Sequence, residues 1–175
     1  MCIRDRHFTS IAGNDIDVEG GTYGWTIDQE AETAKLIKQI KKGKKMTREP
    51  EYSHYAKSRK KNDIGDTYVE VDLGSQHMWF YKNGETVVST PVVTGNTSLG
   101  RGTPTGVYYI LYKTTNYTLT GQGYASPVDY WLPFTHSGVG IHDSSWRSSY
   151  GGSIYTYDGS HGSVSYTHLT LPTIA

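Results

Sequence analysis

Cysteine, long apolar runs and net charge are all scarce in this sequence. Its only cysteine is Cys2, which excludes an intramolecular disulfide framework and any cysteine-ligated metal cluster. No apolar run approaches the roughly 20 residues that a membrane-spanning helix requires, and the N-terminus lacks the apolar core of a signal peptide. The 17 basic side chains balance the 17 acidic ones, which argues against a nucleic-acid-binding surface that covers the protein. We therefore expect no nucleic-acid partner.

Glycine and tyrosine, by contrast, are abundant. The 175 residues include 20 Gly, 15 Tyr and 4 Trp but only 3 Phe, and a chain of this length can form one sizeable core with an appendage. Tyr and Trp keep a polar edge, so the aromatic surface suits polar ligands such as sugars and peptides.

Apolar residues recur at helical spacing over residues 27–40. The pattern predicts a helix at about residues 28–42 with an apolar stripe that faces a core, Asp28 as the N-cap and Gly43 as the stop. Lysines crowd its last turns and the segment that follows, which indicates either a patch for an anionic surface or a solvated helix end with a linker. The polar, basic stretch over residues 50–65 has no apolar periodicity, and we place a domain boundary there.

After residue 65 the apolar period changes to two. Alternating or β-branched runs, each of which predicts a strand, occupy residues 68–73, 77–81, 86–88, 91–94 and 106–112. Between the second and third runs, Asn83-Gly84 can adopt the positive φ angles of a tight hairpin turn. The sequence therefore predicts a mainly β domain, built as a sandwich or a barrel.

Two histidines in a glycine-rich stretch are the best candidates for chemistry. His142 stands beside Asp143, and His161 lies between Ser160 and Gly162. Such a pair offers a general base and a second hydrogen-bonding imidazole next to a flexible turn, with a structural role as the common alternative for a histidine. A metal site formed by His142, Asp143 and His161 is a competing hypothesis, although the compact His-x-x-x-His spacing is absent.

Three ordered motifs follow one another in the second part of the chain. They are Tyr68–Asp72 with Gln76–Tyr81, Thr94-Gly95 with Thr103-Pro104-Thr105-Gly106, and His142 with Ser160-His161-Gly162. Together they resemble the L,D-transpeptidase catalytic domain (YkuD-like family), which has an opening hairpin, a TG and TPTG segment, and a histidine followed by Ser/Thr-His-Gly-Cys. The resemblance covers about residues 66–162. Residues 18–60 are similar to the end of the peptidoglycan-binding-like module that precedes this domain in some members.

The resemblance implies an L,D-transpeptidase-type β-sandwich or barrel over residues 66–162, preceded by a small α+β fragment over residues 7–61. It also implies an exported enzyme on the cell-wall side of the bacterial membrane that uses no cofactor and no metal. In this family a cysteine thiolate attacks the carbonyl between the third residue and the D-Ala of a peptidoglycan stem peptide. An amine of a second stem then resolves the acyl-enzyme to a 3→3 cross-link. The implied partners are stem peptides and, where the cysteine is present, carbapenem inhibitors.

The resemblance also implies roles for individual residues. His142 would be the base, the backbone carbonyl of Asp143 would orient its ring, and the turn formed by Ser160, His161 and Gly162 would position the nucleophile and offer backbone N–H groups to an oxyanion. The side chains expected to bind substrate are Tyr108, Tyr130, Trp131, Trp146 and Arg147, with core packing as the alternative for the four aromatic residues.

The chain departs from the family pattern at the nucleophile. Ser163 stands where the family has cysteine, and Ser165 stands two positions later where the family has Asn. A serine hydroxyl is a much weaker nucleophile, so we expect the chain to be inactive as written. The second hypothesis is a non-catalytic peptidoglycan-binding protein in which Ser163 is genuine. The third is a zinc hydrolase built on the two histidines.

Both chain ends look foreign to the rest of the sequence. Residues 1–6 and 163–175 resemble translated adapter sequence, which recurs at the termini of unrelated conceptual translations. On that hypothesis the native domain continues past Gly162 through a cysteine, a helix and a closing strand, and the native signal or membrane anchor is missing. We therefore expect the chain to leave part of its β core and a sheet edge uncovered.

Overall fold

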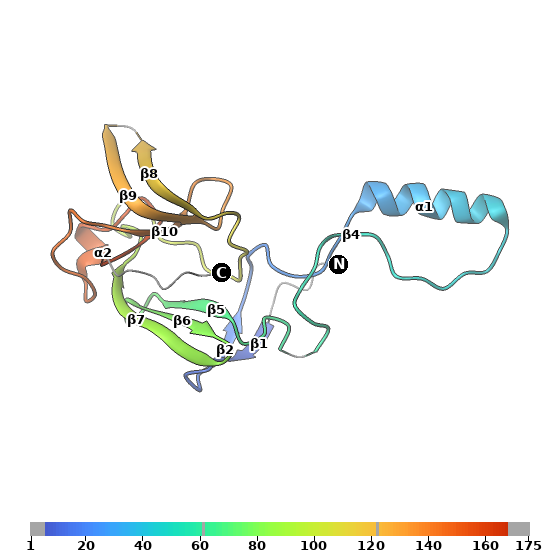
Figure 1. The fold of residues 1–175 in the computed structure, drawn as a ribbon, viewed down its shortest axis with the longest axis horizontal. Coiled ribbons are helices and arrows are strands. Elements are labelled where there is room, and N and C mark those ends of the chain that lie inside the picture. Colours follow the sequence, from blue (N-terminus) through green and yellow to red (C-terminus); the bar gives the residue numbers. More distant parts are fainter. Residues whose placement is uncertain (1–5, 61, 122, 168–175) are drawn as a thin grey trace.

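A computed structural model of the chain describes residues 6–60, 62–121 and 123–167 (Figure 1). Residues 1–5, which include Cys2, and residues 168–175 lie outside the described part, so the adapter hypothesis for them stays a prediction. Neither helix in the described part has the length and apolar character that a membrane crossing requires.

The largest element of the fold is a seven-stranded sheet. Its strands, in spatial order, are β5 (Tyr68–Asp72), β6 (His77–Lys82), β7 (Glu85–Val93), β11 (Val164–Tyr166), β10 (Gly140–Asp143), β9 (Tyr124–Pro133) and β8 (Thr114–Gly121). Neighbouring strands are antiparallel except β10 and β11, which run parallel. Figure 1 shows β5, β6 and β7 in one layer and β8, β9 and β10 in another. The expectation of a mainly β, sandwich-like domain is confirmed.

The hydrophobic core is shared by both halves of the sheet. Met78 on β6 and Val92 on β7 belong to one buried cluster with Leu132 on β9, Ile141 on β10 and Tyr166 on β11. Burial of one such aliphatic side chain contributes about 1.5–3 kcal/mol to stability. This packing fixes the strands whose ends carry the candidate site.

The tight turn predicted at Asn83-Gly84 is confirmed. Asn83 and Gly84 have φ angles of 52° and 85°, and Lys82 pairs with Glu85 where β6 passes into β7. Two positive φ angles define a type I′ turn, whose twist matches that of the two strands. The two short runs predicted after the turn form the single strand β7.

The strand predicted over residues 106–112 is wrong. Val107 forms only an isolated bridge to Gly21, and the Leu111 N–H donates to the Pro133 carbonyl. Its β-branched and aromatic residues resemble a strand, but the backbone partners of the segment are scattered residues. Strands β8, β9 and β10 are absent from the predicted set. β8 is largely exposed on both faces, so it lacks the buried side that gives a strand its apolar period.

Helix α1 (Gln29–Lys42) has the predicted span and the predicted caps. The Asp28 carboxylate accepts the Ala31 N–H at 2.9 Å, and Gly43 ends the helix with a φ of 63°. The prediction that an apolar stripe of this helix faces a core is wrong, because no residue of α1 is buried and Ile40 is 77% exposed. Figure 1 shows α1 projecting away from the sheet, so within the described residues the stripe has no core to face.

The other N-terminal elements form two small sheets. β1 (Arg6–Thr9) pairs with β2 (Asp15–Val18), and β3 (Thr26–Ile27) pairs with β4 (Tyr52–His54). The β1–β2 hairpin packs on the large sheet through Phe8, whose ring meets that of Tyr68 edge to face at 5.3 Å between centroids. This hairpin therefore contacts the domain that begins near residue 66.

Residues just after Gly162 lie inside the large sheet. Val164–Tyr166 form β11, which pairs with β10 on one side and β7 on the other, and all three residues are buried. We expected an uncovered part of the β core here, but Val164–Tyr166 occupy the position between β7 and β10. These three residues belong to the segment that the sequence analysis assigns to adapter sequence. Their origin stays a prediction.

Candidate active site

His142 lies on the buried strand β10 with both ring nitrogens engaged. Its Nδ1 is 2.8 Å from the backbone carbonyl oxygen of Asp143, and its Nε2 is 3.3 Å from the Ser165 hydroxyl. A carbonyl can only accept, so Nδ1 carries the proton and the neutral ring presents the Nε2 lone pair. The contact expected between His142 and the Asp143 carbonyl is present.

The surroundings of His142 favour its neutral form. The side chain is buried, and burial lowers the pKa of His142 below its usual range. The Arg147 guanidinium also lowers this pKa, while the Asp143 carbonyl and charge oppose the shift without reversing it. A neutral imidazole whose Nδ1 is fixed is the form that accepts a proton at Nε2.

Two tryptophans lie next to the His142 ring. The Trp131 ring on β9 is 6.0 Å from the imidazole between centroids, and the Trp146 ring stacks on it at 5.9 Å with an interplanar angle of 26°. Trp131 is buried, whereas Trp146 is 51% exposed. Position 140 must be glycine for this packing, because a Cβ there would lie 2.6 Å from the Trp131 ring.

Two serines at the β11 end of the chain lie beside β10. Ser165 pairs with His142 in the parallel β10–β11 register, and its hydroxyl is 3.3 Å from His142 Nε2. The Ser163 hydroxyl, just before β11, instead accepts the Gly140 N–H at 3.2 Å. The hydroxyl that contacts the base nitrogen is therefore that of Ser165, and position 163, where the family pattern has cysteine, precedes it by two residues.

The turn that precedes Ser163 is held by the TPTG segment. Thr103 Oγ1 accepts the Gly95 N–H at 2.9 Å and donates to the Gly162 carbonyl at 2.7 Å. The Ser160 N–H donates to the Thr94 carbonyl at 2.9 Å. The TG and TPTG motifs thus contact the Ser160-His161-Gly162 turn, although they are far from it in the sequence. The resemblance of all these motifs to one family predicts that they lie together.

Hydrogen bonds inside the turn restrict its backbone. Ser160 Oγ accepts the Gly162 N–H at 3.1 Å and donates to the Ser163 carbonyl at 2.5 Å. The Gly162 N–H, expected to be available to an oxyanion, is therefore engaged within the turn in this structure.

His161 and Asp143 have separate surroundings. The exposed His161 ring stacks on Tyr124 at 5.0 Å between centroids, and the Asp143 carboxylate accepts the Tyr130 N–H at 2.7 Å and the Asp129 N–H at 3.2 Å. No group of three or more His, Cys, Asp or Glu side chains among the described residues is arranged to hold a metal ion. The structure therefore adds no support to the metal-site hypothesis.

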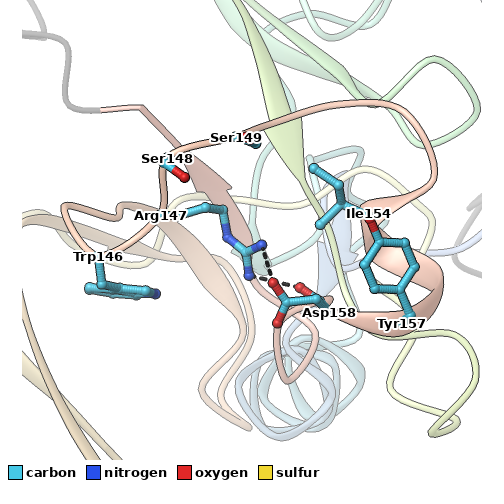
Figure 2. A pocket seen from close by; sticks show the side chains of 7 residues that line it. All are labelled: Trp146, Arg147, Ser148, Ser149, Ile154, Tyr157 and Asp158. Carbon is cyan, nitrogen blue, oxygen red and sulfur yellow. Dashed lines mark hydrogen bonds and ion pairs between the residues drawn. The ribbon is translucent and has the colours of Figure 1, made fainter.

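The residues expected to bind substrate lie in two environments. Tyr108 and Tyr130 pack against the hydrophobic core, as their alternative interpretation expects, and Trp131 is buried. Trp146 and Arg147 instead line an open pocket of about 520 Å³ (Figure 2). The residues that line it are Trp146, Arg147, Ser148, Ser149, Ile154, Tyr157 and Asp158. Substrate binding by the five residues stays a prediction.

Thr103 and Gln76 support the site but were not among the predicted site residues. Gln76 is buried, accepts the Thr94 N–H at 3.0 Å and donates to the Leu73 carbonyl at 2.7 Å. Both residues belong to the motifs that carry the family resemblance. A polar side chain inside such a motif is the signal that could have identified them.

The family model of the L,D-transpeptidase catalytic domain (YkuD) matches residues 66–168 of this chain. No protein with curated annotation matches the chain.

Several solved structures are similar to the chain. A cysteine-to-serine mutant of the L,D-transpeptidase of Enterococcus faecium is 41% identical, covers 93% of this chain and 66% of its own, and has a TM-score of 0.74. The Ldtfm–avibactam carbamoyl enzyme is also 41% identical, with 93% and 64% coverage and a TM-score of 0.73. The catalytic domain of the E. faecium enzyme acylated by ertapenem is 45% identical, with 59% and 83% coverage and a TM-score of 0.53. The chain thus spans just under two thirds of the length of the first two.

Proposed function

This chain belongs to the family of L,D-transpeptidase catalytic domains, and from that membership we propose that its site performs acyl transfer on peptidoglycan stem peptides when position 163 carries a cysteine. We propose further that the chain with Ser163 does not turn over. The proposed acyl transfer produces 3→3 cross-links between stem peptides. It takes place on the cell-wall side of the bacterial membrane.

The observation that carries the proposal is the state of His142. Its Nδ1 is fixed on the Asp143 carbonyl, burial lowers the pKa of the ring and so favours its neutral form, and its Nε2 faces Ser165 on the strand that follows position 163. A neutral imidazole near a thiol takes the thiol proton, and the resulting thiolate is the nucleophile. The protonated ring can then return the proton to the amine of the leaving D-Ala, so that the base is regenerated.

The need for cysteine follows from the chemistry of the two side chains. A free thiol has a pKa of about 8.5, and a neighbouring imidazole lowers it, so that thiolate is present near neutral pH. A serine hydroxyl needs its proton removed during attack by a base in direct contact with it. The Ser163 hydroxyl has Gly140 N–H as its partner in the described part of the chain, and His142 is hydrogen-bonded to Ser165 instead.

The partner of the Ser163 hydroxyl favours a second candidate function. Because this hydroxyl is hydrogen-bonded to the Gly140 N–H and not to His142, it suits a protein that binds peptidoglycan without cleaving it. The two functions differ in one respect, which is whether a thiol at position 163 becomes reactive.

The experiment that separates them is acylation by ertapenem, the compound that acylates the E. faecium relative. Four variants are prepared with Cys2→Ser throughout, so that the thiol at position 2 cannot react. They are the background itself, Ser163→Cys, Ser163→Cys with His142→Gln, and Ser165→Cys. Intact-mass spectrometry then records whether one ertapenem mass is added.

We expect an adduct on Ser163→Cys, none on the serine background, and much slower formation when His142 is also replaced. Ser165→Cys is the matched control, because it places a thiol against His142 in a buried position that a drug-sized molecule does not reach. A Ser163→Cys protein that is folded and gains no mass would favour the binding function and overturn the proposal.

A further inference from the structure

The loop between β10 and α2 (Ile154–Tyr157) contains Trp146, the partly exposed residue whose ring contacts His142. Trp146 lies four residues after the histidine, and its ring stacks on the imidazole at 5.9 Å between centroids. Trp146 also lines the pocket of about 520 Å³. This single ring therefore contacts both the base and the pocket.

The residue next to Trp146 ties this part of the loop to the residue that follows α2. Arg147 Nη1 donates to the Asp158 carboxylate at 2.8 Å, and Nη2 donates to the Asp158 backbone carbonyl at 2.7 Å. Figure 2 shows the guanidinium turned toward Asp158, across the pocket from the Tyr157 ring. The Arg147 side chain is only 12% exposed, whereas that of Asp158 is 70% exposed. We call this pair the Arg147–Asp158 clasp.

The start of the loop is held by different contacts. The Ser144 N–H donates to the Tyr166 carbonyl at 3.0 Å, and the Tyr150 hydroxyl donates to the Ser144 carbonyl at 2.7 Å. In addition, the Arg147 N–H donates to the Ser144 carbonyl at 3.4 Å and closes a backbone turn around Trp146. The clasp is the side-chain hydrogen bond next to Trp146 in sequence.

We infer that Arg147 is a positioning residue, whose clasp to Asp158 keeps the Trp146 ring stacked on His142. The inference rests on the proposed function in one respect, that His142 is the base. The two Nη atoms of the Arg147 guanidinium bind different oxygen atoms of Asp158, which fixes the orientation of the planar group. The ammonium group of a lysine is not planar and could not be fixed in this way.

The clasp also acts on the electrostatics of the base. The Arg147 charge lies close enough to contribute to the lowered pKa of His142. A guanidinium held beside a neutral imidazole disfavours its protonation, so the same residue supports both the geometry and the proton-free state of Nε2.

The inference is tested by NMR of the His142 ring in the whole chain. Ring-proton and ring-nitrogen signals of His142 are identified by their loss in His142→Gln, and Trp146→Ala gives the positions without the stacked indole. The test variants are Arg147→Ala, Arg147→Lys and Asp158→Asn. The matched control is Arg48→Ala, which removes a comparably enclosed arginine that bonds Glu32 beside α1.

We expect Arg147→Ala to move the His142 signals toward their positions in Trp146→Ala. Lysine should restore the signals only in part, and Asp158→Asn, which keeps the backbone carbonyl contact, should move them less. Arg48→Ala should leave them unchanged. Amide signal dispersion shows whether each variant is folded, and the two milder variants give the answer if Arg147→Ala is not.

Two results would overturn the inference. One is a folded Arg147→Ala or Asp158→Asn protein whose His142 signals stay at their original positions while Trp146→Ala moves them. The other is a Trp146→Ala protein whose His142 signals do not move, because the stacking itself would then be absent. Neither readout depends on a reactive thiol, so a failure of the proposed acyl transfer would be seen separately, as an absent ertapenem adduct.

Discussion

Replacement of Thr103 by valine tests how the TPTG segment holds the turn before position 163. Valine keeps the branched shape and removes the hydroxyl that joins the Gly95 N–H to the Gly162 carbonyl. Both glycines are buried, so water does not readily take the place of the hydroxyl. The variant therefore leaves one backbone donor and one backbone acceptor without their partner.

The expected loss of stability follows from these two groups. A buried polar group left without its hydrogen bond costs about 1–3 kcal/mol, so the two together should lower the free energy of unfolding by about 2–6 kcal/mol. For an m value of about 2 kcal/mol per molar urea, the unfolding midpoint should fall by about 1–3 M.

The measurement is urea unfolding followed by tryptophan fluorescence and circular dichroism. Thr105→Val is the control, because it makes the same chemical change two residues away on an exposed side chain. A Thr103→Val protein whose midpoint equals that of Thr105→Val would show that the hydroxyl does not hold the turn, and the argument would fail.

Three further predictions concern other parts of the chain. Tyr166→Phe should raise the free energy of unfolding by about 1 kcal/mol, because the buried Tyr166 hydroxyl has no hydrogen-bond partner among the described residues. A less stable variant in urea unfolding would contradict this. Because burial in the folded state lowers the pKa of His142 below its usual value of 6.5, the contribution of the neutral ring to stability is present above pH 6.5 and is lost as the pH falls from there through the folded-state pKa. Urea unfolding at several pH values should show this loss of unfolding free energy in the unsubstituted chain and a smaller loss in His142→Gln. Equal losses in the two proteins would count against a buried neutral ring. Ile40→Lys on α1 should change the free energy of unfolding by less than about 0.5 kcal/mol because Ile40 is exposed, and a large loss would mean that the helix is covered in solution.

Local features of the fold could be predicted where a few neighbouring residues determine the backbone. Asn83-Gly84 requires two positive φ angles and takes them, and the Asp28 carboxylate caps the helix that begins beside it. The contact from His142 Nδ1 to the Asp143 carbonyl is equally local, because the two residues are adjacent.

Features that depend on distant partners could not be predicted from spacing. The apolar stripe of α1 has helical periodicity, but periodicity does not state whether a partner surface exists. Residues 106–112 have strand-like composition, yet their backbone hydrogen bonds go to residues 20–23 and to Pro133, which only the tertiary fold brings near.

The candidate site shows the same division. The family resemblance identified His142 and position 163, and the motif residues Gly95 and Thr103 do meet the turn before it. The Ser165 contact depends on the parallel register between β10 and β11, which no sequence pattern specifies. The clasp between Arg147 and its partner likewise depends on where α2 ends.

The central claim is that position 163 and His142 form a nucleophile and base pair. It is tested most directly by the pH dependence of iodoacetamide alkylation of Ser163→Cys in the Cys2→Ser background, with and without His142→Gln. The account predicts an apparent thiol pKa below the usual value of about 8.5 when His142 is present and a return to about 8.5 when it is replaced. Two coincident profiles would contradict it, because they would show that the imidazole does not act on a thiol at position 163.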